Sequence, residues 1–228
     1  AEALVNRAQP TILLMIYSLT ISILIGVPAG IISAIKQNSV VDRLVMMLAI
    51  SGIAIPNFVL GIFMIMIFAV WLGWLPTGQY TDIFVDPVDH FRRMAMPAFA
   101  LGFSSAALLA RLVRSSMLDV LREDYVRTAF AKGVSFRSVI TEHALRNALI
   151  PTITVIGYSV GTLLGGAVVT ETVFALPGMG RLVVNSIGRR DFPVIQGAVM
   201  VIAAAYELTN LAVDILYVYI DPRIRYGD

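Results

Sequence analysis

The sequence predicts an all-α, polytopic membrane protein with five transmembrane helices, and three observations predict it. Of the 228 residues, 58% are hydrophobic and 14% are charged, whereas about a quarter of the residues of a typical soluble domain are charged. The mean hydropathy is +0.83. Five apolar stretches are each long enough to cross a bilayer, which takes about 20 residues. This composition excludes a disordered chain, a nucleic-acid-binding domain and most soluble enzymes.

The five predicted spans are separated by loops of different character. The spans run over residues 11–35, 44–74, 94–112, 150–174 and 194–220. Helices are expected because backbone polar groups in lipid must form hydrogen bonds within their own segment. Trp71, Trp74 and Tyr80 gather at one end of the second span, as is typical of the aromatic belt at a membrane interface.

The distribution of Lys and Arg predicts the orientation of the chain. Eleven of the 17 cationic residues lie in the first loop, the third loop and the tail, and six lie at the N-terminus and in the second and fourth loops. The positive-inside rule places the first group in the cytoplasm. The C-terminus is then cytoplasmic, and the start of this sequence lies outside. Arg189 and Arg190, in the fourth loop, run against the rule.

The third loop, residues 111–151, is too polar to cross the membrane and is patterned as two short helices. The first helix is marked by residues that recur at helical spacing: Leu118, Leu121, Tyr125 and Ala129. We expect it to end near Lys132, with Gly133 as its C-terminal cap, and we expect Ser135 to cap the second helix. Two interpretations fit, a basic helix lying on anionic lipid headgroups and a docking element for a cytoplasmic partner.

Polar residues inside the spans are candidates for a translocation path. Glu207 lies near the middle of the fifth span, and Asn210 shares its helix face. An ionisable group at that depth usually faces a cavity or a partner, although a structural contact between helices also fits. Pro56 and Asn57 interrupt the second span and predict a kink, which could line the path, serve as a hinge or reflect plain packing.

Two further features of the fourth span predict packing. Glu171 stands near its outer end, where we expect it to anchor the following loop. Gly157, Gly161 and Gly165 recur every fourth residue and form a close-packing ridge. That ridge suits either an interface with a second, homologous subunit or packing within this chain.

Residue patterns for catalysis are not found. The chain has no cysteine, so it can form neither a disulfide nor a thiolate metal site. It has no GxxxxGK[ST] phosphate-binding loop, and His90 and His143 have no second ligand at metal spacing. We therefore predict no catalytic residue, no metal site and no cofactor in this chain.

The third loop carries a resemblance to a known family. Residues 122–151, REDYVRTAFAKGVSFRSVITEHALRNALIP, resemble the cytoplasmic signature of permease subunits of ATP-binding-cassette (ABC) importers, in the peptide and nickel branch. Residues 26–61, 171–197 and 221–226 are similar to other segments of that family, and motifs of this length in this order are specific. One departure is that residues 127–129, Arg-Thr-Ala, stand where the general importer signature has Glu-Ala-Ala.

The resemblance implies that the chain is an inner-membrane permease of a bacterial importer and is not an enzyme. Residues 1–228 would form one transmembrane domain of the type I class, with a coupling region at residues 119–150 and a sixth span ahead of this sequence. The subunit would form half of the translocation path for peptides or related small solutes. Its partners would be a homologous second permease, two cytoplasmic ATPase subunits that bind ATP and Mg²⁺, and a periplasmic substrate-binding protein.

The resemblance also implies roles for particular residues. The residues implied to couple the loop to the ATPase are Asp124, Tyr125, Arg127, Thr128, Ala129, Lys132, Gly133 and Arg137. A small Ala129 would allow close approach, Gly133 permits a tight turn, and the cations could pair with acidic groups of the partner or with lipid headgroups. The residues expected along the translocation path are Pro56, Asn57, Glu207 and Asn210.

The main alternative is a secondary transporter driven by an ion gradient. That class is built from inverted repeats around broken helices, and the sequence shows no convincing repeat. An intramembrane enzyme would need a paired nucleophile or a metal set, and a structural scaffold would leave the ordered third loop unexplained. The cargo stays open among dipeptides, oligopeptides, nickel chelates, glutathione and opines.

Overall fold

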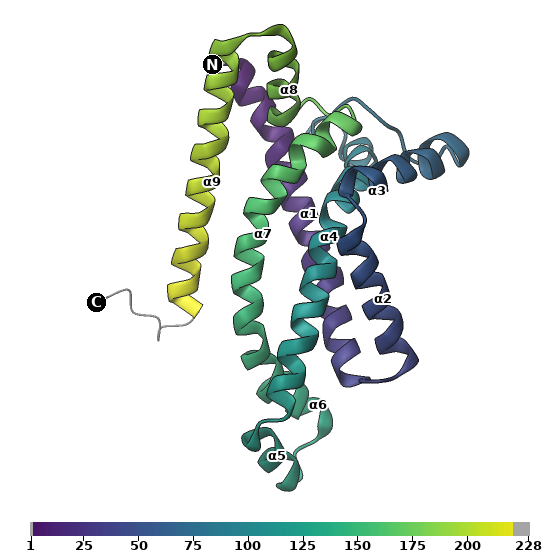
Figure 1. Ribbon diagram of the computed structural model, residues 1–228, viewed down its shortest axis with the longest axis vertical. Helices are drawn as coiled ribbons and strands as arrows, with labels where there is room; N and C mark the ends of the chain where they lie inside the picture. The colour runs from purple at the N-terminus through teal and green to yellow at the C-terminus, as the bar shows by residue number, and fades with distance from the viewer. Residues whose placement is uncertain (1, 221–228) are drawn as a thin grey trace.

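The structure is a computed structural model that describes residues 2–220. Ala1 and the tail 221–228, which carries Arg223 and Arg225, lie outside the described residues. The described residues form helices and turns, with no strand among them, which confirms the all-α prediction. Most of the helices run side by side along one axis (Figure 1). The elements are α1 (Glu2–Ile35), α2 (Val40–Ala54), α3 (Asn57–Met64), the π-helix η1 (Ile65–Trp71), α4 (Pro87–Leu121), α5 (Asp124–Ala131), α6 (Phe136–Ser138), the π-helix η2 (Val139–Ala144), α7 (Leu145–Val173), α8 (Met179–Arg189) and α9 (Phe192–Ile220).

The number of membrane spans agrees with the prediction. Four helical segments are long and apolar enough to cross a membrane by themselves, at residues 6–35, 87–121, 136–173 and 192–211. A fifth span results if α2 and the segment formed by α3 and η1 are counted together. These two parts meet at an angle of 103°, so the second predicted span is a broken one.

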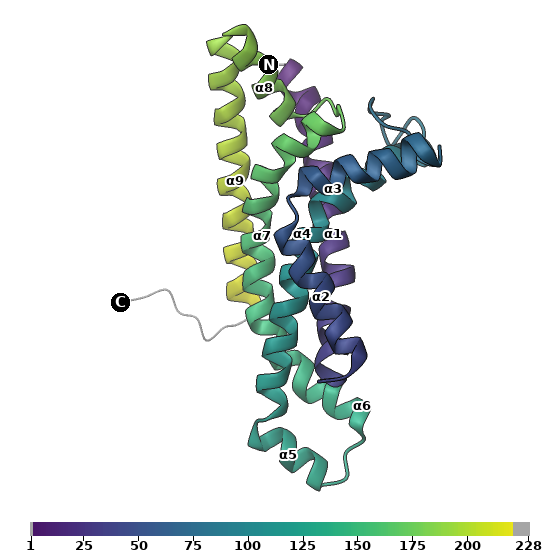
Figure 2. The same ribbon diagram turned by 45° about the vertical axis from the view of Figure 1, so that its right-hand side comes forward.

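Pro56 causes this break, as the sequence predicted. The ring of Pro56 disfavours helical angles at the preceding residue, and Ile55 adopts φ −85° and ψ 120°. The last bond of α2 runs from the Ile55 N–H to the Ser51 carbonyl at 2.9 Å, and α3 begins at Asn57. The kink is large enough that α3 and η1 project sideways from the bundle as an arm (Figure 2).

Helix α4 occupies the centre of the bundle and packs closely along α1. Glycines make this close approach possible, because a Cβ on Gly26 would lie 2.6 Å from the Ala106 carbonyl oxygen and one on Gly102 would lie 2.5 Å from that of Ser18. The α4 face toward the core buries large side chains, among them Met94, Met96, Leu101 and Leu109. The third predicted span, residues 94–112, is therefore the middle of a 35-residue helix.

The glycine ridge of α7 packs partly within this chain. A Cβ on Gly161 would lie 2.6 Å from the ring of Tyr206 in α9, whereas Gly165 has no atom near its Cβ position within 4 Å. Of the two interpretations of this ridge, packing within the subunit is the one that Gly161 supports.

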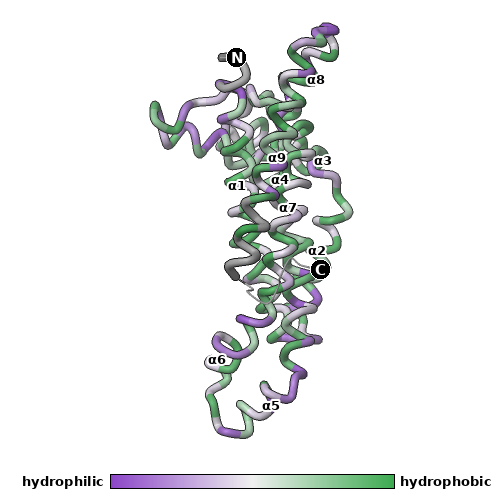
Figure 3. The backbone as a smooth tube through the Cα atoms, turned by 90° about the vertical axis from the view of Figure 1, so that its left-hand side faces the viewer, coloured by the Kyte–Doolittle hydropathy of each residue, from purple (hydrophilic) through white to green (hydrophobic). Residues whose placement is uncertain are grey.

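Helix α8 differs from the prediction, in which residues 175–193 form a loop between two spans. These residues form an 11-residue helix and then turn into α9. Figure 3 shows hydrophilic stretches at the α8 end of the molecule and at the opposite end, around α5 and α6, with mostly hydrophobic chain between them. The molecule therefore presents two polar ends on either side of an apolar body.

Candidate functional site

The connection between α4 and α7 forms the polar end around α5 and α6. Helix α4 ends at Leu121 with Arg122 as its C-terminal cap, and α5 follows directly after Glu123, which is extended at φ −66° and ψ 145°. Lys132 caps the C-terminus of α5, and Gly133 makes the turn at φ +80°. The hydroxyl of Ser135 accepts a hydrogen bond from the Ser138 N–H at 3.3 Å. The predicted helix end, glycine turn and serine cap are all confirmed.

One part of this prediction was wrong. Leu118 and Leu121 were assigned to the amphipathic helix of the loop, but they belong to the end of α4. The break at residues 122–123 contains no glycine or proline, so no local signal in the sequence marks it. The loop helix is shorter as a result, with eight residues.

The loop has a small core of its own. Val126 and Ala129 of α5 pack with Val139 of η2, and Val120 and Leu121 at the end of α4 cover them. Ala129 is only 8% exposed. It therefore faces into the loop and packs against the small core of the loop.

The other seven residues expected to couple the loop to a partner are exposed. They are Asp124, Tyr125, Arg127, Thr128, Lys132, Gly133 and Arg137. The Arg127 guanidinium lies 3.6 Å from the Asp124 carboxylate, but the two side chains are 76% and 98% exposed, so this ion pair contributes little. Phe130 and Phe136 stack with ring centroids 6.2 Å apart, and both rings are exposed. The surface of the loop thus combines cations with aromatic rings.

Tyr125 connects the loop to α7 through hydrogen bonds of its hydroxyl. Its hydroxyl donates a hydrogen bond to the His143 carbonyl at 3.3 Å and accepts one from the Asn147 amide at 2.8 Å. The side chain thereby links the first turn of α5 to the first turn of α7. A force applied to α5 would reach α7 through this contact.

A second polar cluster, which the sequence did not predict, lies near the same end of the bundle. The Arg114 guanidinium of α4 makes two hydrogen bonds to the Asp42 carboxylate of α2, at 2.7 and 2.8 Å. The Ser33 hydroxyl donates to the same carboxylate at 2.5 Å, and the Asn38 N–H donates at 2.9 Å. In the sequence, Asp42 and Arg114 each stand out as a charged residue next to an apolar segment. Nothing in the sequence indicates that these two residues form a pair.

At the opposite end, Glu171 joins three helices. Its carboxylate is fully buried, accepts a hydrogen bond from the Thr11 hydroxyl of α1 at 2.6 Å and accepts one from the Arg181 N–H of α8 at 3.0 Å. The Thr11 hydroxyl in turn accepts from the Met179 N–H at 2.9 Å. A carboxylate at the first turn of α8 satisfies N–H groups that have no partner within the helix. Glu171 anchors the following segment, as predicted, whereas the part of Thr11 was missed.

A histidine is buried near the same end. The His90 Nδ1 lies 2.7 Å from the Thr81 carbonyl, and its Nε2 lies 3.0 Å from the Tyr17 hydroxyl. Because a carbonyl only accepts, Nδ1 carries the proton and Nε2 accepts from Tyr17. Among the described residues, no group of three His, Cys, Asp or Glu side chains is placed to hold a metal ion. His90 instead ties α1 to α4 and to the segment before α4.

The residues expected along a translocation path are not brought together within this chain. Pro56 is exposed and Asn57 is half-buried beside Gly166 of α7. Glu207 is exposed and Asn210 is half-buried on α9. Figures 1 and 2 both place α9 and α3 on opposite sides of α7.

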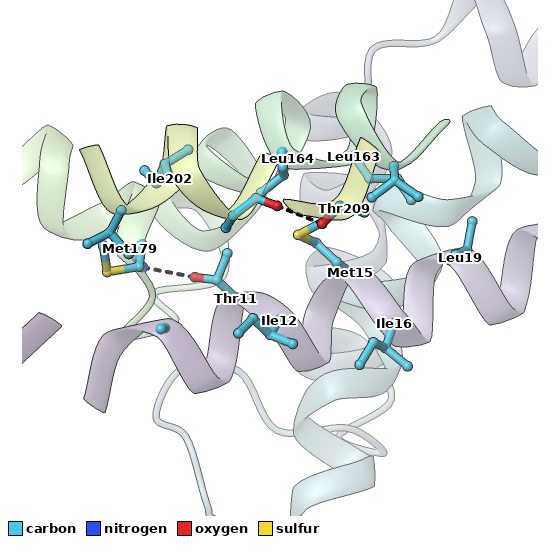
Figure 4. Close-up of a pocket in the computed structure, with 14 residues that line it drawn as sticks. Thr11, Ile12, Met15, Ile16, Leu19, Leu163, Leu164, Met179, Ile202 and Thr209 are labelled. Carbon is cyan, nitrogen blue, oxygen red and sulfur yellow. Dashed lines mark hydrogen bonds between the residues drawn. The ribbon is translucent and has the colours of Figure 1, made fainter. Parts of the chain in front are cut away.

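An apolar cavity lies between α1, α7 and α9 (Figure 4). It has a volume of about 280 Å³, and its walls are formed by aliphatic and methionine side chains such as Ile12, Met15 and Leu163. Thr11 and Thr209 are its polar residues. The Thr209 hydroxyl already donates to the Ala205 carbonyl, so the cavity offers little to a charged solute.

Comparison with known proteins gives a consistent result. The family described as "Binding-protein-dependent transport system inner membrane component" matches residues 26–226. The glutathione transport system permease proteins GsiC of Escherichia coli (strain K12) and of Shigella flexneri serotype 5b (strain 8401) are each 46% identical to this chain over 226 residues, which is 99% of the chain and 71% of the relative.

Solved structures agree on the fold. A chain of the methionine ABC transporter MetNI in inward-facing conformations matches with a TM-score of 0.74 and 17% identity over 97% of both chains. An amino acid ABC transporter matches with a TM-score of 0.64 and 16% identity, over 98% of this chain and 94% of the other. At these identities the likeness establishes the fold alone.

The members of the matched family share several properties. Its members are non-catalytic, multi-pass proteins of the inner membrane, contain no cofactor and work with an ATPase and a binding protein. Membership excludes the secondary transporter that the sequence left as an alternative. Because the family match covers most of the sequence and relatives are 46% identical over nearly all of it, the chain belongs to the binding-protein-dependent inner membrane components and is a permease subunit of an ABC importer.

Proposed function

We propose that this permease imports small peptides of about the size of glutathione. The proposal is supported by the relatives that are 46% identical and are named as permeases for glutathione transport. The apolar cavity between α1, α7 and α9 holds no charged side chain that would recognise such a solute. Selection of the cargo would therefore rest mainly with the binding protein, and the permease would supply the path.

The path would form between this subunit and a homologous second permease, in a complex with two ATPase subunits and a periplasmic binding protein. In the most apolar window of α9, only 6% of the residues are buried within this chain. Glu207 lies on this helix and is exposed, and an ionisable group in a membrane span is expected to face a cavity or a partner and not lipid. We place Glu207, Asn210, Pro56 and Asn57 along this path.

Residues 119–150 would be the coupling region of a single transmembrane domain, of the type I class, that covers residues 1–228. The observation that carries this assignment is a folded loop at one end of the bundle, with its own core inside and with cations and aromatic rings outside. Exposed Arg127, Lys132 and Arg137 suit acidic groups on the ATPase. The contact of Tyr125 with His143 and Asn147 would pass the movement of the loop into α7.

This assignment sets the orientation of the subunit. The loop would lie in the cytoplasm, together with the inner end of α9 and the C-terminus. The connection between α8 and α9 would then lie outside, since Figure 1 shows it at the opposite end of the molecule from α5 and α6. The excess of cations on the loop side supports the same orientation.

A pull-down from native membrane in mild detergent, followed by mass spectrometry, tests the proposed complex. We expect ATPase subunits, a second multi-span protein and a binding protein to be recovered with this chain. Recovery of this chain alone, or only as a homo-oligomer in several detergents, would contradict the complex.

Charge reversal tests the coupling region. We expect Arg127→Glu to reduce uptake driven by ATP by about tenfold or more, because one close charge pair at an interface contributes about 1.4 kcal/mol or more. Arg43→Glu is the matched control, since Arg43 is an exposed cation in the first turn of α2 whose guanidinium donates to the Asn38 carbonyl. Equal uptake by the Arg127→Glu variant and the wild type would show that the loop is misassigned.

A further inference from the structure

The carboxylate of Asp42 joins three parts of the chain near the end of the bundle that carries α5. The Ser33 hydroxyl donates to it from the last turn of α1, the Asn38 N–H donates from the connection to α2, and Arg114 donates twice from α4. The Ser39 hydroxyl caps α2 by accepting from the Asp42 N–H at 3.2 Å. One buried side chain therefore fixes the α1–α2 hairpin, which consists of α1, α2 and their connection, to α4.

Arg114 stands where α4 leads into the loop. It lies two turns before Leu121, the last residue of α4, and α5 begins three residues after Leu121. Met117, one turn after Arg114, is fully buried and packs in a cluster with Ala34 at the end of α1. A movement of the loop that displaces the end of α4 therefore reaches the pair of Asp42 and Arg114.

Apolar packing alone would leave these helices free to slide along one another, because apolar contacts have no preferred direction. The contacts between α2 and α4 are otherwise apolar, and a Cβ on Gly52 would lie 2.8 Å from the Ala107 Cβ. Two parallel hydrogen bonds between a guanidinium and a carboxylate, in contrast, require one relative geometry. The Asp42–Arg114 pair therefore sets the register of α2 on α4.

The chemistry of the pair points to positioning more than to stability. Ala34, Val113 and Met117 form an apolar cluster beside it, and apolar residues of similar volume in place of a buried ion pair are often neutral or stabilising. The best-attested use of a buried charged group is to fix a register or to serve as a switch. We therefore looked for what a fixed register of α2 would control.

Helix α2 leads from the pair to residues that we expect along the translocation path. It runs beside α4 in Figures 1 and 2, breaks at Pro56 and continues as α3 from Asn57. The Asn57 amide nitrogen lies 3.5 Å from the position that a Cβ on Gly166 of α7 would take. A shift of α2 along α4 would therefore move Pro56 and Asn57 against α7.

We propose that Asp42 and Arg114 are positioning residues of the transport cycle, which make α4 and the α1–α2 hairpin move as one body when the loop moves. This inference rests on the proposed function, which supplies the ATPase and the path. The pair passes the displacement of the loop into α2 and on to Pro56 and Asn57. It acts beside the route that leads through Tyr125 into α7. Rigid-body movement of this kind carries local changes across many proteins.

An apolar replacement of both partners separates positioning from stability. The test uses the whole transporter in proteoliposomes with its binding protein, and glutathione as the imported probe. We expect Asp42→Leu/Arg114→Met to keep the melting temperature of the wild type but to lower the glutathione imported per ATP hydrolysed by about fivefold or more, the lower end of usual coupling between two sites. A wild-type ratio in this variant would overturn the proposal.

Arg114→Lys gives a second variant that does not depend on repacking the site. Lysine keeps the positive charge, but its ammonium is a point charge without the planar fork that fixes the geometry. We expect the subunit to assemble normally and the glutathione imported per ATP to fall by a smaller factor than in the apolar double variant. A wild-type ratio in Arg114→Lys would show that charge alone suffices and would overturn the role in register.

The ion pair of Asp89 and Arg93 is the matched control. Its atoms lie 2.6 Å apart and it is also found on α4, but both partners belong to that one helix. Asp89→Leu/Arg93→Met should therefore leave the glutathione imported per ATP unchanged. An equal loss in both double variants would mean that the ratio responds to any lost ion pair on α4, and it would overturn the assignment to Asp42 and Arg114.

The movement itself can be measured, because the chain has no cysteine. Lys36→Cys and Ser115→Cys place spin labels on the α1–α2 connection and on α4, and both positions are exposed. Pulsed electron paramagnetic resonance of the transporter in nanodiscs, with partner subunits free of cysteine, gives the distance between the labels. We expect the same distance with and without ATP, and a distance that changes with ATP in Asp42→Leu/Arg114→Met. A change in the otherwise wild-type protein, or none in the variant, would overturn the proposal.

The outcomes distinguish this inference from the proposed function. If Arg127→Glu lowers uptake while Asp42→Leu/Arg114→Met keeps the wild-type ratio, the coupling region stands and the positioning role of Asp42 and Arg114 fails. If the transporter with the wild-type chain shows no uptake driven by ATP, the proposed function fails and this inference fails with it.

Discussion

Glu171 is a buried carboxylate in a tightly packed environment. Its carboxylate is fully buried, and the Thr11 hydroxyl and the N-terminus of α8 both donate to it. The fit is tight, because a Cβ on Gly178 would overlap the carboxylate. The residue 160 positions away, Thr11, completes the site, so this cluster fixes three helices at one point.

We expect Glu171→Gln to lower the stability of the subunit. The amide has one acceptor oxygen where the carboxylate has two, so one buried donor would face an NH₂ group, at a loss of about 1–3 kcal/mol. Thermal unfolding of the purified subunit in detergent measures this. Glu207→Gln, on an exposed side chain, is the control and should leave the melting temperature unchanged; equal effects of the two variants would show that the cluster is not stabilising.

The Asp42–Arg114 pair is the corresponding contact at the other end. The two side chains are 5% and 24% exposed, and four hydrogen bonds reach the Asp42 carboxylate from Arg114, Ser33 and Asn38. The ion pair between Arg127 and Asp124 differs from it, because both of its side chains are exposed and the charged groups lie 3.6 Å apart.

We therefore expect Arg114→Gln to destabilise the subunit by about 3–5 kcal/mol, because it leaves a buried carboxylate without its counter-charge. Arg127→Gln should change stability by less than about 1 kcal/mol. The double variant Asp42→Asn/Arg114→Gln should recover part of the loss. Denaturant unfolding of the four proteins checks this, and equal losses for Arg114→Gln and Arg127→Gln would refute it.

At the scale of elements, hydrogen bonds to the Asp82 carboxylate hold the segment between η1 and α4 in place. Its carboxylate accepts hydrogen bonds from the Phe84 N–H at 2.9 Å and from the Gln9 amide at 3.0 Å. These bonds hold the pKa of Asp82 below its usual value, the Phe84 N–H being the main cause. A lowered pKa in the folded state means that the ionised form stabilises the segment above the unfolded pKa. That contribution is lost as the pH falls through the folded pKa.

Trp71 and Trp74 are the only tryptophans of the chain and lie at the start of this segment. We expect the tryptophan fluorescence of the purified subunit to change in an acid transition, below the ordinary titration range of an aspartate. The transition should be absent in Asp82→Asn. An identical acid transition in both proteins would assign it to another group.

At the scale of the whole molecule, the helices are unequally covered by the rest of the chain. Helix α4 is surrounded by α1, α2, α3 and α7, whereas α9 contacts chiefly α7 and α8. Glu207 lies on α9 and is exposed. A subunit of this shape suits association with a second permease.

We expect Glu207→Gln to lower ATP-driven uptake in proteoliposomes without changing the recovery of this chain in membranes. The neutral amide keeps the shape of the side chain but removes the charge that a path or a partner would use. Uptake is measured beside a pull-down of the second permease. If neither uptake nor assembly changes, Glu207 belongs to neither the path nor the interface.

The sequence by itself determined the features that depend on local composition and spacing. Apolar length predicted the spans, Pro56 predicted the break in the second one, and Gly133 and Ser135 predicted the turn and cap of the third loop. Each of these follows from the chemistry of a few neighbouring residues. The family resemblance rested on the third loop and on the similar segments at residues 26–61, 171–197 and 221–226.

Only the tertiary structure decided which distant residues meet. It paired Thr11 with Glu171 and Asp42 with Arg114 across 160 and 72 positions, turned Ala129 inward and bent the second span by 103°. A helical period indicates which residues share a face, but it does not specify the helix that covers that face. Those contacts depend on how several helices pack at once, because each buried polar group must find its partner on whichever neighbour comes within hydrogen-bond distance.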